Sequence, residues 1–204
     1  MIAQNWLCNK CGHSVLGPFP PEKCPSCGAE RKCFRRENEF KFPEGELEHV
    51  ITTCWKISYG LYMVSSLDGD KINGQICNAF MQITSDPPRF AVGINRSNLT
   101  HEYIEKSGVF AASILGKDQQ KIVRRFGYRS GREFDKFKGL EIIKGRTGCP
   151  VLKDAIGYIE CAIIKDMQVN AGTHSIFVGD VAGGETFRDE EPMTYAYYHQ
   201  TRHS

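Results

Sequence analysis

Short apolar runs separated by turn residues dominate the chain from residue 59 onward. Eight runs rich in Val, Ile, Phe and Tyr have the composition of β-strands: residues 59–67, 72–84, 89–95, 109–115, 140–145, 156–169, 175–187 and 193–198. Turn signals such as Asp68-Gly69 and Asp86-Pro87 separate them. Many strands with few helices predict a mainly β domain built as a β-barrel.

Ahead of this β-rich part, apolar residues recur at helical spacing. These residues are Leu47, Val50, Ile51 and Cys54. They predict a short amphipathic helix that ends at about Lys56. The polar segment before it contains Pro43 and Gly45 and is typical of a linker.

Two further helices are predicted within the β-rich part. The first covers residues 99–107 and has Ser97 or Asn98 as its cap. The second covers residues 118–127, with Asp118 as its cap and Gly127 near its end. Its apolar face consists of Ile122, Val123 and Phe126. Both helices are short, so the domain remains mainly β.

The composition is that of a globular protein. Hydrophobic residues make up 41% of the 204 residues and charged residues 25%, which is enough for one ordinary domain plus a small appendage. A net charge of +2 implies no strong polyanion, such as nucleic acid, as a partner. No apolar run reaches the roughly 18 residues of a membrane helix, so no membrane is expected as a partner. The residues before Cys8 are too few for a signal peptide, and a cytoplasmic location is expected.

Four of the nine cysteines form two Cys-x-x-Cys pairs, Cys8 with Cys11 and Cys24 with Cys27. An odd number of cysteines with two such pairs indicates metal-bound thiolates in a reducing compartment. A glycine follows each pair and lets the backbone turn tightly. Four thiolates suit a tetrahedral iron or zinc ion, and spacing alone does not separate the two metals. Of the five other cysteines, Cys33, Cys54, Cys149 and Cys161 have no paired spacing and receive no role.

The segment NWLCNKCGHSVLGPFPPEKCPSCGAERKCF resembles the short rubredoxin-like domain of rubrerythrins. The shared features are Trp6 before the first cysteine, the glycine after each pair, the PEKCP entry into the second pair, and Phe34. The segment departs from the pattern at His13, where an aromatic residue is usual. The resemblance implies iron, with a structural zinc ribbon as the alternative. Because the segment is short, it has little core of its own. The metal is therefore expected to supply much of its folding energy.

The rest of the chain resembles the flavin reductase family, whose members fold as FMN-binding split β-barrels. The motifs that carry the resemblance are ISYGLYMVSSLDGDKINGQICNAFMQITSDPPRFAVGINRSNLTHEYI, FGYRSGREFDKF, GTHSIFVGDV and PMTYAYYH. They are most similar to flavoredoxin and to the flavin domain of high-molecular-weight rubredoxins, in which the metal module follows the flavin domain instead of preceding it. The expected domains are a rubredoxin-like metal domain over residues 1–36, a linker over residues 37–46 and the split barrel over residues 47–204.

The resemblance places the FMN phosphate at the NRSNLT segment. Its binding residues would be Asn95, Arg96, Ser97, Asn98 and Thr100. The exposed N–H groups and the positive dipole at a helix start suit a phosphate. Plain helix capping uses the same residue types and is the alternative.

The resemblance places the NGQICNAF segment beside the isoalloxazine ring. The residues it offers are Asn73, Gln75, Cys77 and Asn78. The alternative is an ordinary strand after a hairpin, with Asn73-Gly74 as the turn. The thiol of Cys77 could tune the flavin, but we interpret it as a small buried side chain.

Two further segments are candidates for the nicotinamide site. The resemblance puts His174 near the flavin, where it would orient the cofactors, since hydride transfer needs no general base on the protein. A lone histidine beside an apolar strand is also typical of a structural role. The segment 126–137 carries Arg129, Arg132 and Lys136. It is either a solvated charged loop or a flap that meets the phosphates of the nicotinamide cofactor.

Together the two resemblances imply a homodimeric, NAD(P)H-dependent FMN flavoprotein. It would pass electrons from flavin to a rubredoxin-type iron and on to an acceptor such as a flavodiiron or peroxide-reducing protein. One alternative is a flavin reductase with a structural zinc ribbon, and another is a non-catalytic, flavoredoxin-like electron shuttle. The sequence carries no Gly-x-Gly-x-x-Gly dinucleotide fingerprint, so the choice between NADH and NADPH stays open.

Overall fold

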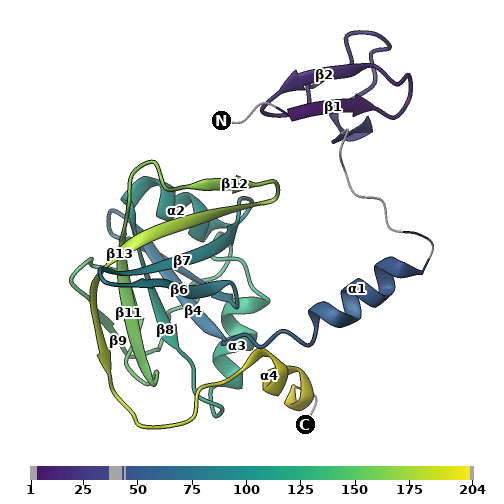
Figure 1. Cartoon of the computed structure of the whole chain (residues 1–204). Helices are drawn as coiled ribbons and strands as arrows, with labels where there is room; N and C mark the ends of the chain where they lie inside the picture. Colours follow the sequence, from purple (N-terminus) through teal and green to yellow (C-terminus); the bar gives the residue numbers. More distant parts are fainter. Residues whose placement is uncertain (1–3, 37–42, 44, 203–204) are drawn as a thin grey trace. The chain divides into compact units, whose positions relative to one another are not determined.

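The computed structural model describes residues 4–36, 43 and 45–202. The chain divides into two compact units, Met1–Lys56 and Ile57–Ser204 (Figure 1). Most of the linker predicted over residues 37–46 lies outside the described residues, and the three-part domain division stays a prediction.

The first unit contains a three-stranded antiparallel sheet in the order β2-β1-β3. Its strands are β1 (Gln4–Cys8), β2 (Ser14–Gly17) and β3 (Phe34–Arg36), with the 3-10 turn η1 (Arg31–Cys33) before β3. Its buried core consists of Cys8, Cys24, Ala29 and Phe34. Trp6 packs against this core and donates from Nε1 to the carbonyl oxygen of Gly17 at 3.1 Å. A core of four residues holds little apolar surface.

The helix predicted after the linker is present as α1 (Glu46–Cys54). None of its residues is buried, and Leu47 and Ile51 are 51% and 49% exposed. Among the residues that the structure describes, the apolar face that predicted the helix is therefore not buried.

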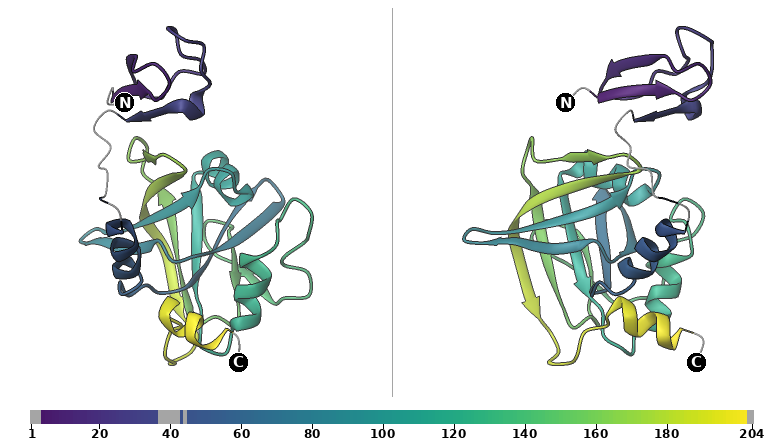
Figure 2. Two further views of the ribbon diagram at one scale, coloured as in Figure 1. Left: turned by 90° about the vertical axis from the view of Figure 1, so that its right-hand side faces the viewer. Right: turned by 45° about the vertical axis from the view of Figure 1, so that its right-hand side comes forward.

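The second unit is built on an antiparallel sheet in the order β5-β4-β8-β11-β13-β7-β6. Its strands are β4 (Tyr62–Asp68), β5 (Lys71–Cys77), β6 (Phe80–Ser85), β7 (Pro88–Asn95), β8 (Val109–Ile114), β11 (Gly157–Ile163) and β13 (His174–Thr186), with β12 (Val169–Ala171) paired to β13. β9 (Ile142–Lys144) and β10 (Pro150–Leu152) form a separate pair. The sheet curves strongly, with β6 and β7 running across β8 and β11 (Figures 1 and 2). The mainly β fold is confirmed.

The strand prediction differs from the structure around β5 and β6. The run 72–84 is two strands, because Asn78 and Ala79 interrupt it between β5 and β6. Asn73 and Gly74 lie inside β5, so the alternative that made them a hairpin turn is wrong. The turn lies at Gly69, whose φ of 60° favours glycine.

Three helices accompany the sheet. They are α2 (Leu99–Ser107), α3 (Gln120–Gly127) and α4 (Tyr195–Thr201). The start of α2 after Asn98 is as predicted. The start of α3 differs, because α3 begins after Gln119. The carboxylate of Asp118, predicted as its cap, instead accepts a hydrogen bond from Arg188 at 3.2 Å. No described helix has both the length and the apolar character needed to cross a membrane.

The strand predicted over residues 193–198 is wrong, since α4 occupies most of it. The hydroxyl of Thr194 accepts a hydrogen bond from the N–H of Tyr197 at 3.1 Å and caps the helix. Tyr198 is buried in a core cluster and Tyr195 packs against that cluster, three positions apart on one helical face. Tertiary packing therefore outweighs the strand propensity of these aromatic residues.

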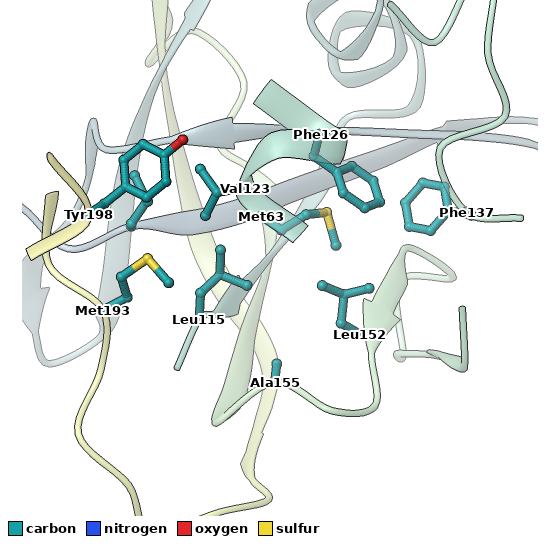
Figure 3. Close-up of a cluster of buried hydrophobic side chains, with 10 residues drawn as sticks. Met63, Leu115, Val123, Phe126, Phe137, Leu152, Ala155, Met193 and Tyr198 are labelled. Atoms are coloured by element: carbon teal, nitrogen blue, oxygen red, sulfur yellow. The ribbon is translucent and has the colours of Figure 1, made fainter. Parts of the chain in front are cut away.

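The core cluster under α3 and α4 is drawn in Figure 3. Val123 and Phe126 of α3 pack there, as their helical spacing predicted. Phe137 joins the same cluster with its ring 5.0 Å from that of Phe126. Both ends of the segment 126–137 are therefore anchored in the core. This places the intervening residues close to the start of α2 and to β5.

Candidate functional site

The two Cys-x-x-Cys pairs form matching backbone turns. The N–H of Gly12 donates to the carbonyl oxygen of Cys8 at 2.8 Å, and the N–H of Gly28 donates to that of Cys24 at 2.9 Å. Both glycines have positive φ, 73° and 71°. Glycine is needed there because other residues rarely adopt this conformation. The turns bring the four sulfur atoms together.

The four sulfur atoms have the spacing of a tetrahedral metal centre. All lie within 4.8 Å of one another, with 3.7 Å between Cys8 and Cys27 and 3.6 Å between Cys11 and Cys24. A tetrahedron with metal–sulfur bonds of about 2.3 Å has edges of about 3.8 Å. The thiols therefore fit a four-coordinate ion, and the geometry suits iron and zinc alike.

The electrostatics of the four thiols also favour a bound cation. A hydrogen bond from the N–H of Ala29 lowers the pKa of Cys27, but the neighbouring thiols and desolvation raise it to about 12 overall. Four thiolates this close repel one another unless a cation lies among them. Charge and geometry thus favour the same bound ion.

A polar cavity of about 320 Å³ lies in the second unit. It gathers five of the residues predicted to bind the flavin: Asn73, Gln75, Ser97, Asn98 and Thr100. Ile76, Leu99, the segment 126–132 and Lys136 complete its lining. We call this space the polar cavity. Three segments far apart in the sequence therefore form one site.

Two hydrogen bonds join β5 to the start of α2 at the polar cavity. Nδ2 of Asn73 donates to Oγ1 of Thr100 at 2.8 Å, and both side chains are buried. Nδ2 of Asn98 donates to Oε1 of Gln75 at 3.0 Å. The side chains predicted to hold the phosphate and those predicted to hold the ring thus contact one another directly.

The polar side chains before α2 do not act as a helix cap. Asn98 occupies the capping position but makes no side-chain hydrogen bond to the first turn. Oδ1 of Asn95 accepts from the N–H of Ser97 at 3.0 Å and from its hydroxyl at 2.9 Å. The start of α2 is therefore not closed by a side chain and borders the polar cavity.

Cys77 and Asn78 line a neighbouring cavity of about 260 Å³. Cys77 is buried, its Sγ lies 3.5 Å from the carbonyl oxygen of Gly93, and burial raises its pKa to about 12. A neutral buried thiol agrees with its interpretation as a small side chain that fills space. The two cavities share Tyr128 in their lining.

Asn95, Arg96 and His174 do not line the polar cavity. His174 pairs with Asn95 across β13 and β7, and the N–H of Arg96 donates to the carbonyl oxygen of Thr173 at 2.9 Å. His174 is exposed, with Nδ1 2.9 Å from the hydroxyl of Thr173. These three residues flank the start of α2, and their roles stay predictions.

The segment 126–137 is held against the polar cavity. Arg132 forms an ion pair with Glu102 of α2. Gly131 approaches Asn73 so closely that a Cβ there would lie 2.0 Å from Oδ1 of Asn73. A larger residue would push this segment away from β5. Gly131 therefore permits the contact that closes this side of the cavity.

Lys136 is not the solvated residue that one alternative for this segment predicts. It is only 4% exposed, and its Nζ donates to the carbonyl oxygen of Phe126 at 3.4 Å. Burial lowers its pKa to about 8. Lys136 points inward because Phe137, the next residue, is fixed in the core. The charged composition of the segment gave no sign of this burial.

Known protein families match both parts of the chain. Residues 55–204 match the family model described as a flavin reductase like domain. Residues 6–35 match the model described as a rubrerythrin, rubredoxin-like domain. Each matched range contains the motifs on which its resemblance was based.

Individual relatives agree with these matches. A high molecular weight rubredoxin from Moorella thermoacetica is 45% identical over 148 residues, which span 72% of this chain and 64% of that protein. A ferric-chelate reductase (NAD(P)H) from Archaeoglobus fulgidus is 42% identical over 73% of this chain and 88% of that protein. The structure of NADH:FAD oxidoreductase SgcE6 from Streptomyces globisporus C-1027 has a TM-score of 0.67 at 23% identity, covering 78% of this chain and 93% of the other. At this sequence identity, the similarity to the last structure shows a shared fold and nothing more.

Proposed function

The chain belongs to the flavin reductase family and carries a rubredoxin-like domain, and we propose that it passes electrons from NAD(P)H through FMN to a rubredoxin-type iron. The observation that carries the proposal is the four-sulfur cluster on the same chain as the polar cavity. A bound flavin takes two electrons as a hydride and passes them on singly, which suits a one-electron iron acceptor.

Different residues of the polar cavity would bind different parts of the flavin. Ser97, Asn98 and Thr100, with the N–H groups at the start of α2, would hold the phosphate. Asn73 and Gln75 would face the polar edge of the ring from β5. Lys136 would offer a buried positive charge to the anionic cofactor. One cavity with one helix start favours a single phosphate, as in FMN.

The two relatives suggest different electron acceptors. One is named a high molecular weight rubredoxin and the other a ferric-chelate reductase. This chain spans 64% of the first. We propose a redox protein, such as a flavodiiron or peroxide-reducing protein, as the acceptor. The rubredoxin-like domain would present the electron to it. His174 would orient the nicotinamide beside the flavin.

We also propose that the working form is a homodimer. Leu47 and Ile51 on α1, and Met81 and Ile83 on β6, are large apolar side chains that are 42% to 62% exposed. A second copy would remove part of this surface from water. Sedimentation of the flavin-loaded protein over a dilution series should show dimers. Monomers that retain one flavin each would contradict the dimer.

The test of the proposed function is a visible spectrum with metal analysis on protein purified anaerobically from its own source. We expect one iron and one FMN per chain, and bleaching of both after NADH or NADPH is added, with the flavin bleaching no later than the iron. Zinc in place of iron would favour a flavin reductase with a structural zinc ribbon. Iron and flavin that bleach only after another reduced protein is added would favour an electron shuttle.

A further inference from the structure

His101 is a buried histidine of α2 that the proposed function leaves without a role. It follows Thr100 directly and lies in the first turn of the helix. Its side chain is only 3% exposed. Nε2 lies 2.8 Å from Oγ of Ser175 on β13, and Ser175 is buried as well. The pair therefore joins the end of α2 that borders the polar cavity to a strand of the sheet.

The surroundings of this ring favour a neutral imidazole. The ring packs against Phe177, with the ring centroids 5.2 Å apart. Burial lowers the pKa of His101, and the opposing effect of Glu105 does not reverse this shift. Oε2 of Glu105 lies 3.6 Å from Nδ1 and favours a proton on that nitrogen. Nε2 is then left to accept the hydroxyl hydrogen of Ser175.

Ser175 is a fixed anchor, because strands pair with it on both sides. It lies in β13 opposite Ile94 of β7 and Asn170 of β12. Ladder hydrogen bonds to two neighbouring strands hold the backbone of β13 in place. A hydrogen bond from this hydroxyl therefore fixes the group that accepts it, which here is the histidine in the first turn of α2.

The loop between β7 and α2 is tied to the same region of the chain at three points. β7 pairs with β13 as far as Asn95. The N–H of Arg96 then donates to the carbonyl oxygen of Thr173, directly before β13, at 2.9 Å. The bond between His101 and β13 is the third tie. Residues 97 and 98 lie between the second and third ties, so their positions depend on both.

We propose that His101 is a positioning residue for the phosphate of the flavin. The proposal rests on the proposed function, in which Ser97, Asn98 and Thr100 hold that phosphate. Hydrogen bonds to a phosphate need their donors in the right place, and a shift of the first turn by about 0.5 Å is enough to weaken them. The histidine would not touch the flavin. It would hold the donors in place through its bond to Ser175.

Two flavins separate a positioning role from a purely structural one, because riboflavin lacks the phosphate that FMN carries. Fluorescence titration of the full, flavin-free chain measures both dissociation constants, and the parent should bind FMN more tightly. His101→Phe keeps a ring against Phe177 and removes both nitrogens, and Ser175→Ala removes the hydroxyl. In each variant the dissociation constant of FMN should rise about tenfold, because a buried hydrogen bond is lost. That of riboflavin should change by less than about twofold.

Two further variants test the hydrogen bond itself. His101→Gln places an amide near the position of Nε2, which can still bond to Ser175, so it should recover most of the FMN affinity. His101→Phe combined with Ser175→Ala should weaken FMN binding no more than either change alone, because both act through one bond. Effects that add in the double variant would show that the two residues act separately, against the proposal.

Ser66→Ala is the matched control for Ser175→Ala. Ser66 is another buried serine bonded to α2, with its Oγ 3.0 Å from that of Ser107 at the other end of the helix. Urea unfolding should show that both serine variants are less stable than the parent. Only Ser175→Ala should change the ratio of the FMN and riboflavin dissociation constants.

The outcomes separate this role from the proposed function. FMN and riboflavin that weaken equally in His101→Phe and Ser175→Ala would show a purely structural role and overturn the proposal. A parent that prefers FMN, with variants that keep the full preference, would refute only the role of His101. A parent that binds FMN no more tightly than riboflavin would refute the phosphate site of the proposed function, and the positioning role with it.

Discussion

The two units of the chain rely on different sources of stability. The core of the first unit has four buried residues, and two of these, Cys8 and Cys24, are also candidate metal ligands. The second unit buries three further clusters, two of which have ten residues each. So small a core cannot offset the entropy of ordering its chain without a bound ion. A barrel of this size can fold on apolar packing alone.

The candidate sites of the two units are also assembled differently. Cys8 and Cys27 are 19 residues apart, and two short turns bring all four ligands together. In the polar cavity, Asn73 and Thr100 are 27 residues apart, and Lys136 comes from a third segment. The candidate metal site is thus a local feature, whereas the candidate flavin site requires the finished barrel. Four changes test this contrast.

The largest effect is expected from Cys8→Ser with Cys11→Ser. Loss of two of four thiolates should abolish metal binding, which contributes on the order of 10 kcal/mol to folding in small thiolate domains. Metal analysis should find no ion, and hydrogen exchange of residues 4–36 should reach the rate of unfolded chain. The second unit should still bind FMN, because its core contains no metal ligand.

Cys54→Ser is the matched control, since Cys54 is exposed and lies outside the thiol cluster. It should retain the metal and the slow exchange of residues 4–36. Loss of FMN in the double variant would show that the second unit depends on the first. A first unit that stays ordered without metal would show that its own core is sufficient for folding.

Ser97→Ala with Thr100→Ala should weaken FMN binding without affecting the metal. Each lost hydrogen bond to a charged phosphate contributes about 1.5–3 kcal/mol. Thr100→Ala also removes the hydroxyl that accepts a hydrogen bond from the buried Asn73 amide. The contact between β5 and α2 should therefore become weaker. Fluorescence titration of the flavin measures the dissociation constant, which should rise by about a hundredfold or more.

The control for this pair is Thr84→Ala with Ser85→Ala, which removes the same two side-chain types from β6, outside the polar cavity. FMN binding should not change. Normal FMN binding in Ser97→Ala with Thr100→Ala, together with a less stable α2, would instead show that these residues serve the helix alone.

The sequence predicts the local features of this molecule well and the long-range ones only in part. The Cys-x-x-Cys turns and the helical faces of α1 and α3 depend on near neighbours, so their spacing was sufficient. The strand predicted at Tyr195 failed because packing of α4 on a distant core decides its structure. The inward position of Lys136 likewise depends on contacts between segments, which no spacing rule records.

Lys136 gives the barrel a pH dependence of its own. Its pKa is about 8 in the folded chain and 10.5 when it is exposed, because burial disfavours the charge. The unfolded chain therefore binds more protons between these values, so the free energy of unfolding should rise as pH increases from about 8 to about 10.5. The full rise is about 3 kcal/mol at most.

Lys136→Met keeps the length of the side chain and removes the charge, so this rise should disappear. Urea unfolding of the flavin-free parent and variant, followed by far-ultraviolet circular dichroism at several pH values, measures it. FMN binding should weaken in the variant if the buried charge faces the cofactor. A parent and variant with the same pH dependence would show that Lys136 is solvated in solution.

The smallest effect is expected from Arg132→Gln. Its ion pair with Glu102 is exposed, so its loss should leave the unfolding midpoint unchanged. The pair nevertheless ties the segment 126–137 to α2 beside the polar cavity, so FMN should dissociate a few-fold faster when it is broken. Lys106→Gln breaks another exposed ion pair of α2, with Asp68 at 2.7 Å, and is the control. Stopped-flow dilution of the flavin complex measures both rates, and equal rates would show that the segment does not hold the flavin.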